Sequence, residues 1–199
     1  MKITLTKQEA ITLINKLSVL YEESEIEIVD DIEPEKPILQ NEFESNVDYT
    51  SLNLIYKNIV LPKLKGALIS EAKDIFKSYI DSDFENWNLN SKTSSKETKI
   101  NVHEITKDGT LKEIFGRFNC DLDKLVMTQG QIIEFCKNHK EELGQNWYNF
   151  FLIKENDEYF VADVHVHSDG LKAVVVRFVN GDVWSAEFRL RVFVPQLDI

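Results

Sequence analysis

The feature that most constrains this fold is a run of apolar segments between Phe150 and Val194 that is interrupted by short turn sequences. The turn sequences are Asn156-Asp157, Asp169-Gly170 and Asn180-Gly181. Asn-Gly and Asp-Gly pairs favour two-residue β-hairpin loops, because such loops need a positive φ at both central positions. Valine and aromatic residues dominate the intervening segments, so we predict a C-terminal antiparallel meander of four or more strands.

The two glycine-containing turns also predict a register, and the register decides which residues share a face of the sheet. With Asp169-Gly170 and Asn180-Gly181 as two-residue loops, Val175 lies opposite both Val164 and Ala186. One face then contains Ala162, Val164, Val166, Ala173, Val175, Trp184, Ala186, Phe188 and Leu190. We expect this face to form the core, and a helix to cover the apolar end of the other face. The helix predicted at 129–143 is the candidate for that cover.

The other face of the predicted meander carries a polar strip, which is the candidate binding site. Its residues are Asp163, His165, His167, Lys172, Glu187 and Arg189. In the predicted register His167, Lys172 and Arg189 form one cross-strand row, and His165 shares the next row with Glu187. The leading hypothesis is a non-enzymatic binding module that presents this strip to a protein or a small ligand. Solvated or paired strand residues are the structural alternative.

A second hypothesis is a metal-dependent enzyme. Asp163, His165 and His167 occupy alternate positions of one strand, so they share a face and offer imidazole and carboxylate ligands. Lys172 and Arg189 beside them would oppose a metal cation electrostatically. We therefore expect no metal, no cofactor and no catalytic residue here. The sequence contains no GxSxG, P-loop, GxGxxG or HExxH motif.

Other periodic segments make the predicted fold α+β. A strand is expected at 100–105, and Thr110 with Glu113 predicts a capping box at the start of a short helix. Thr128 is expected to begin the helix at 129–143. Helical spacing of apolar residues also predicts helices at 51–60 and 62–81, and residues 1–30 have the pattern of a strand–helix–strand unit.

Two polar stretches predict the domain organisation. Residues 30–48 are acidic and include two prolines, and residues 88–98 are rich in serine. We predict an N-terminal region at 1–87 that contains the acidic linker, a second linker at 88–98, and a C-terminal α+β domain at 99–199.

Composition limits the possible partners. The 199 residues include 34 acidic and 23 basic side chains, for a formal net charge of −11. Such a charge repels phosphate backbones and anionic membranes, so we expect neither general nucleic-acid binding nor membrane association. The sequence has no signal-peptide pattern and no apolar run of membrane-spanning length, which favours the cytoplasm. The acidity supports a third hypothesis, an acidic phage or immunity-type inhibitor that occupies a basic partner surface.

Three stretches of the C-terminal half resemble a module in uncharacterised proteins of uncultured, small-genome bacteria. They are LKEIFGRFNCDLDKLVMTQGQIIEFCKNHK, FFLIKENDEYFVADVHV and VWSAEFRLRVFVPQL. The resemblance covers residues 99–198. It implies a bacterial or phage origin and a modular C-terminal domain. No activity is known for that module, so the resemblance assigns no catalytic residue.

Overall fold

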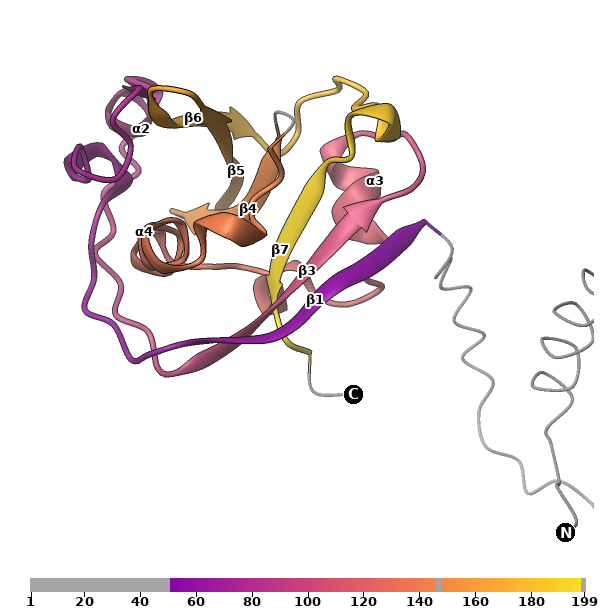
Figure 1. Cartoon of the computed structure of the whole chain (residues 1–199), viewed down its shortest axis with the longest axis horizontal. Helices are drawn as coiled ribbons and strands as arrows, with labels where there is room; N and C mark the ends of the chain where they lie inside the picture. Colours follow the sequence, from indigo (N-terminus) through magenta and orange to yellow (C-terminus); the bar gives the residue numbers. More distant parts are fainter. Residues whose placement is uncertain (1–50, 146–147, 198–199) are drawn as a thin grey trace, which may run out of the picture. The chain divides into compact units, whose positions relative to one another are not determined.

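A mixed β-sheet organises the part of the chain that the computed structural model describes, residues 51–145 and 148–197 (Figure 1). These residues belong to one compact unit, Glu44–Ile199. The sheet has seven strands in the order β1-β3-β7-β4-β5-β6-β2. The strands are β1 (Leu52–Leu61), β2 (Tyr79–Ile80), β3 (Thr98–Ile105), β4 (Asn149–Glu155), β5 (Glu158–His167), β6 (Gly170–Arg177) and β7 (Arg191–Pro195).

Short helices connect and cover the strands. The α-helices of the described residues are α2 (Asp83–Asn86), α3 (Leu111–Gly116) and α4 (Gln129–Asn138). The 3-10 helices are η1 (Ile69–Glu71), η2 (Leu122–Lys124), η3 (Lys140–Glu142) and η4 (Ala186–Phe188). None of these helices is long and apolar enough to span a bilayer. The α+β composition agrees with the sequence, whereas the arrangement of the strands does not.

The prediction of an antiparallel meander is wrong, because the sheet is mixed. β4, β5 and β6 are antiparallel neighbours, but β7 lies parallel to β4 and β2 lies parallel to β6. β7 is also antiparallel to β3, at some distance along the sheet from β6. The chain leaves the sheet after β6 and returns on the far side of β4, so the last predicted hairpin does not form.

The Asn180-Gly181 pair does not make the predicted two-residue hairpin for a local reason. The Asn180 side chain accepts a hydrogen bond from the Asp182 amide at 3.1 Å. This contact is an Asx turn, which competes with the left-handed conformation that a hairpin loop requires. Among the described glycines only Gly170 has a positive φ, of 139°. Residues 178–190 therefore form a loop that contains η4 instead of a strand.

The register between β5 and β6 differs from the predicted one by two residues. Val164 pairs with Ala173 instead of Val175, because the turn is made by Ser168 and Asp169 and Gly170 begins β6. A shift of two residues preserves the faces of a strand. The predicted core residues Ala162, Val164, Ala173 and Val175 are accordingly buried. The Asn156-Asp157 turn does form as predicted, with φ values of 48° and 62°.

The helices predicted at 51–60 and 62–81 are also wrong. The first is β1, and the second is loop, η1 and β2. β1 carries register shifts between Leu54 and Tyr56 and between Tyr56 and Ile59. These bulges break the period of two, so Leu52, Ile55 and Ile59, at the helical spacing i, i+3 and i+7, are less exposed than the residues between them. A bulged strand thus imitates the apolar spacing of a helix.

Helices cover both faces of the sheet. Ile132 and Phe135 of α4 pack on Phe151, Ala162 and Val164, and we call this side the α4 face. Ile114 and Phe115 of α3 pack on the other side, the α3 face, whose core strand residues include Phe150, Leu152 and Val161. Figure 1 shows the two helices on opposite sides of the sheet. α4 therefore covers the Ala162 side, and α3 covers the face for which the sequence suggested α4.

Two sequence signals in this region are confirmed. Thr110 and Glu113 form a reciprocal capping box at α3, and Thr128 begins α4 with a capping box that Gln131 completes. The strand predicted at 100–105 is β3.

Residues 88–98 run from α2 to β3, and strands on both sides of this stretch join the one sheet. The predictions for residues 1–30 and 30–48 lie outside the described residues.

Candidate functional site

The polar residues predicted on β5 lie on the α3 face, beyond the part that α3 covers. Asp163, His165 and His167 alternate along β5 with residues of the α4 face, of which Val164 is buried and Val166 partly buried. Lys172 of β6 lies directly opposite His165, while Gly170 lies opposite His167. Four of the six predicted site residues therefore come from adjacent strands. The pairing differs from the predicted rows because of the two-residue register shift.

Asp163 is inside the protein, where it holds His165. Only 2% of Asp163 is exposed. Its Oδ2 lies 2.7 Å from Nε2 of His165, and its Oδ1 accepts a 3.3 Å hydrogen bond from the Asn149 amide. Burial raises the pKa of the Asp163 carboxyl, and the hydrogen bond from His165 opposes part of that rise. Asp163 thus fixes the His165 ring and does not itself face a partner.

Asn149 extends this polar network at the start of β4. The side chain is fully buried and accepts a 2.6 Å hydrogen bond from the Gly144 amide. Its amide nitrogen donates to the carbonyl oxygens of Gly144 and Val164 at 3.2 and 2.8 Å. The loop before β4 is therefore fastened to β5, which positions Tyr148 beside His165.

Aromatic rings and histidines form a continuous outer surface around Tyr148. The ring centroid of Tyr148 lies 5.1 Å from His165, 5.0 Å from Trp184 and 6.2 Å from Phe188. The rings of His165 and His167 are parallel, with centroids 6.1 Å apart. We call these five residues the aromatic–histidine surface. Phe188 is 51% exposed, whereas the other members are partly buried.

The remaining predicted site residues, Glu187 and Arg189, flank Phe188 in the 178–190 loop. Both are exposed, and neither belongs to a strand row as the sequence suggested. Arg189 has a left-handed backbone, with φ 50°, which lets the chain turn from η4 into β7. The loop is held to the turn between β3 and α3 by a 2.7 Å hydrogen bond from the Ala186 amide to Asp108 and by a bridge between Gly109 and Trp184.

This arrangement offers poor metal ligation. The described part of the chain contains no group of three or more His, Cys, Asp or Glu side chains placed to share an ion. Nε2 of His165 faces Asp163 at hydrogen-bond distance, which removes one ligand atom from the predicted trio. The geometry instead favours a binding surface whose aromatic and histidine rings are held in fixed orientations.

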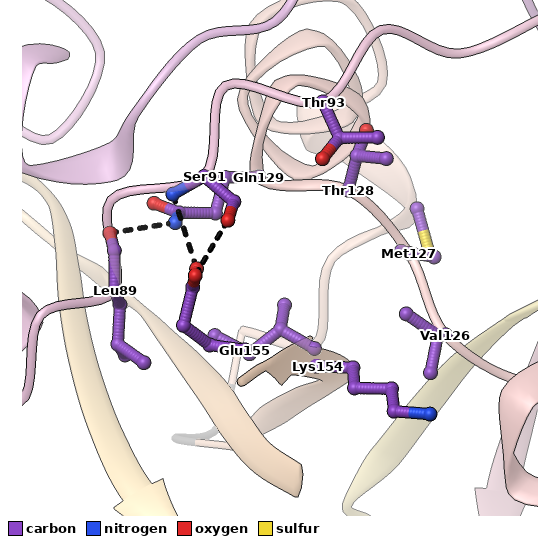
Figure 2. A pocket seen from close by; sticks show the side chains of 10 residues that line it. Leu89, Ser91, Thr93, Val126, Met127, Thr128, Gln129, Lys154 and Glu155 are labelled. Carbon is purple, nitrogen blue, oxygen red and sulfur yellow. Dashed lines mark hydrogen bonds between the residues drawn. The ribbon is translucent and has the colours of Figure 1, made fainter. Parts of the chain in front are cut away.

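A separate cavity lies on the α4 face, at the N-terminal end of α4 (Figure 2). Residues 88–98, which we call the strap, cross this end of the sheet. The buried side chain of Gln129 donates to the Leu89 carbonyl at 2.9 Å and accepts from the Ile69 amide at 2.9 Å. Glu155 accepts hydrogen bonds from the Ser91 amide and hydroxyl at 3.1 and 2.5 Å. The serine-rich stretch is thus fastened by buried polar side chains.

Sequence reasoning did not select the aromatic partners of the histidines or the anchors of the strap. The expected Asn-Gly hairpin places Phe188 in the core, and the aromatic residues at the start of the meander, Tyr148 among them, are also expected to serve as core anchors. Glu155 offers a weak signal, because this carboxylate lies near the apolar run Phe150–Ile153 and has the strand parity of Phe151 and Ile153. Gln129 offers none, since glutamine in a first helical turn is usually exposed.

No protein-family model, curated protein or solved structure matches this chain. A functional assignment therefore has to come from the two sites just described.

Proposed function

We propose that this protein is a binding module whose α3 face docks a partner protein through the aromatic–histidine surface. The observation that carries the proposal is Phe188, a large apolar side chain that remains 51% exposed at the rim of a fixed ring cluster. The same loop also exposes Val183, at 68%. Exposed apolar side chains that adjoin partly buried aromatic rings are typical of protein interfaces.

The rings are well suited to provide binding energy. Tyr148 and Trp184 are packed against the α3-face core, so they lose little conformational entropy when a partner covers them. His165 is fixed by Asp163, which itself is buried in the sheet. Aromatic residues with one apolar and one polar side are favoured at interface centres. A rigid cluster of this kind supports a partner contact made by the surface as it stands.

A protein partner fits the surface better than a small molecule. Two cavities of the described residues, of about 170 and 310 Å³, are lined by other side chains. The aromatic–histidine surface instead has charged residues of both signs around it, including Lys172, Glu187 and Arg189. An apolar centre with a polar rim is the usual anatomy of a protein interface. The partner would therefore present an apolar group with charges beside it.

The proposal can be tested by comparing Phe188→Ser with Leu54→Ser. Leu54 lies on β1, the terminal strand of the described sheet, and its exposed fraction of 46% is close to that of Phe188. Each variant and the wild-type chain would be used as bait in lysate of the encoding organism, with retained proteins quantified by mass spectrometry. A partner identified in this way would then be purified and titrated.

We expect Phe188→Ser to weaken binding of that partner by about tenfold or more, the effect of losing one central apolar contact. Leu54→Ser should bind like the wild type. The combined variant H165A/K172A/R189A should also bind weakly. Equal retention of the same partner by all four proteins would show that the α3 face is not the docking site.

A further inference from the structure

The cavity under the strap has the size of a small organic ligand. Its volume is about 170 Å³. For comparison, an apolar cavity of about 150 Å³ in another protein binds benzene. The walls combine buried apolar side chains of Leu89, Met127 and Ile153 with the polar groups of the strap and of the start of α4. A molecule of about six non-hydrogen atoms fits this volume.

Glu155 gives the cavity its chemical character. The residue is only 7% exposed, and its carboxylate receives both of its hydrogen bonds from Ser91. Within the described residues Glu155 takes part in no ion pair. A buried carboxylate without a positive partner is costly, because neutral hydrogen-bond donors replace only part of its hydration. A cationic ligand would provide the missing charge.

The positive groups nearby do not fill this role. The Lys154 side chain points away from the Glu155 carboxylate in Figure 2. Its Nζ lies 2.8 Å from Asp123 and 3.7 Å from Asp157. The N-terminus of α4 is closed by its own capping box, in which Thr128 and Gln131 satisfy each other's backbone amides. A helix end contributes roughly half a positive charge, which is less than the full charge of a carboxylate.

We propose that this cavity binds a small organic ammonium ion, with its nitrogen on the Glu155 carboxylate and its short aliphatic chain against Met127 and Ile153. A calcium or magnesium ion is a poorer occupant, because such ions need about six oxygen ligands, usually from several carboxylates. Among the described residues that line the cavity, Glu155 is the only acidic one. The site is on the α4 face and does not depend on the docking surface of the α3 face.

The strap provides the entrance. Ser91 and Thr93 line the cavity and are both exposed residues. The two hydrogen bonds from Ser91 to Glu155 are the contacts that close the strap over the carboxylate. An ammonium group that enters here donates to the same oxygens. Binding should therefore change the amide environment of Ser91 more than that of residues outside the cavity.

The test uses three probes of equal length with different charge, n-butylammonium, n-butanol and butyrate. Each is titrated into the full-length, isotope-labelled protein while amide chemical shifts are followed. We expect saturable shifts at Ser91 and Gln129 with butylammonium, and only weak, unsaturated shifts with butanol and butyrate. Shifts of equal size with butanol would refute the proposal, because the cavity would then bind without regard to charge. No saturable response to butylammonium would also refute it and would indicate a cavity filled by water only.

Glu155→Gln keeps the shape of the side chain but removes its charge. It should weaken butylammonium binding by at least about tenfold, because the charge-assisted hydrogen bond is lost. Glu158→Gln is the matched control, since Glu158 begins the next strand and is exposed. If Glu155→Gln does not fold, Val126→Phe narrows the cavity and leaves Glu155 in place. Undiminished binding in the folded variant used would overturn the proposal.

Discussion

The two faces of the sheet use polar residues in opposite ways. On the α4 face, the buried side chains of Gln129 and Glu155 hold the strap over the end of the sheet. On the α3 face, the buried carboxylate of Asp163 holds a histidine that belongs to the outer surface. One face is closed by polar contacts with its own chain, and the other presents oriented rings beside exposed apolar groups.

Because of this difference, we expect the polar contacts of the α4 face to affect stability and the rings of the α3 face to affect partner binding. Removing an anchor on the α4 face should leave buried backbone groups without partners, which is expensive. Removing an exposed ring on the α3 face should cost little stability but should reduce partner binding. The comparison predicts that substitutions on the two faces fall into two classes, and the largest effects on unfolding should come from the strap anchors.

The largest expected effect is that of Gln129→Ala. This change leaves the Ile69 amide and the Leu89 carbonyl without their hydrogen-bond partner inside the protein. We expect a loss of about 3 kcal/mol in the free energy of unfolding. Urea unfolding followed by circular dichroism measures it. Gln145→Ala is the control, because Gln145 is exposed, and it should change stability by less than about 0.5 kcal/mol. Similar losses in both variants would mean that the strap is not held by Gln129.

Gly66→Ala tests how firmly the strap is held in place, because Gly66 lies directly beside the strap backbone. A Cβ atom at Gly66 would lie 2.1 Å from the carbonyl oxygen of Lys92, so the strap backbone has to move. We expect a loss of about 2 kcal/mol from this overpacking. Gly181→Ala is the matched control on the α3 side, because a Cβ atom there meets nothing within 4 Å. A Gly66→Ala protein as stable as Gly181→Ala would show that the strap is free to shift.

The sequence predicts the parts of this fold that depend on local patterns. The capping box at Thr110, the helix start at Thr128 and the burial of Ala162 and Val164 follow from short-range chemistry and from strand alternation. The faces of β5 and β6 were predicted correctly although their register was not, because the register error was two residues, an even number. The error arose because Gly170 begins β6 and does not occupy the turn itself.

The parts that could not be predicted depend on distant contacts. A serine-rich composition predicts a linker, whereas contacts with distant residues make the strap an ordered element. Gln129 and Glu155 lie 40 and 64 residues away from their partners in the strap. Leu64 also pairs with Ser95. The bulges of β1 imitate helical spacing, so period alone gives the wrong element. The candidate site was located on β5, but its ring partners come from outside the predicted rows. The 178–190 loop places Phe188 there because the chain continues to β7 instead of turning back.

Acid sensitivity provides the smallest test of the comparison, and it concerns the α3 face. His103 of β3 packs its ring against Phe118 at 5.0 Å, and its Nδ1 is buried without a hydrogen-bond partner among the described residues. Desolvation by burial lowers the pKa of His103 from 6.5 to about 4. The folded protein therefore keeps this imidazole neutral at a pH where the unfolded chain takes up a proton.

Stability should consequently fall as the pH decreases from about 6.5 to about 4, because over this window the unfolded state binds more protons at His103. We expect the loss to be about 1 kcal/mol, since the ring is partly exposed and solvent screens its charge. His103→Leu removes the titrating group, so the difference in unfolding free energy between wild type and variant should change by this amount between pH 7 and pH 4.5. A difference that is independent of pH would mean that His103 is solvated in the folded state. The α3 face would then contain no buried, charge-sensitive histidine beside Phe118.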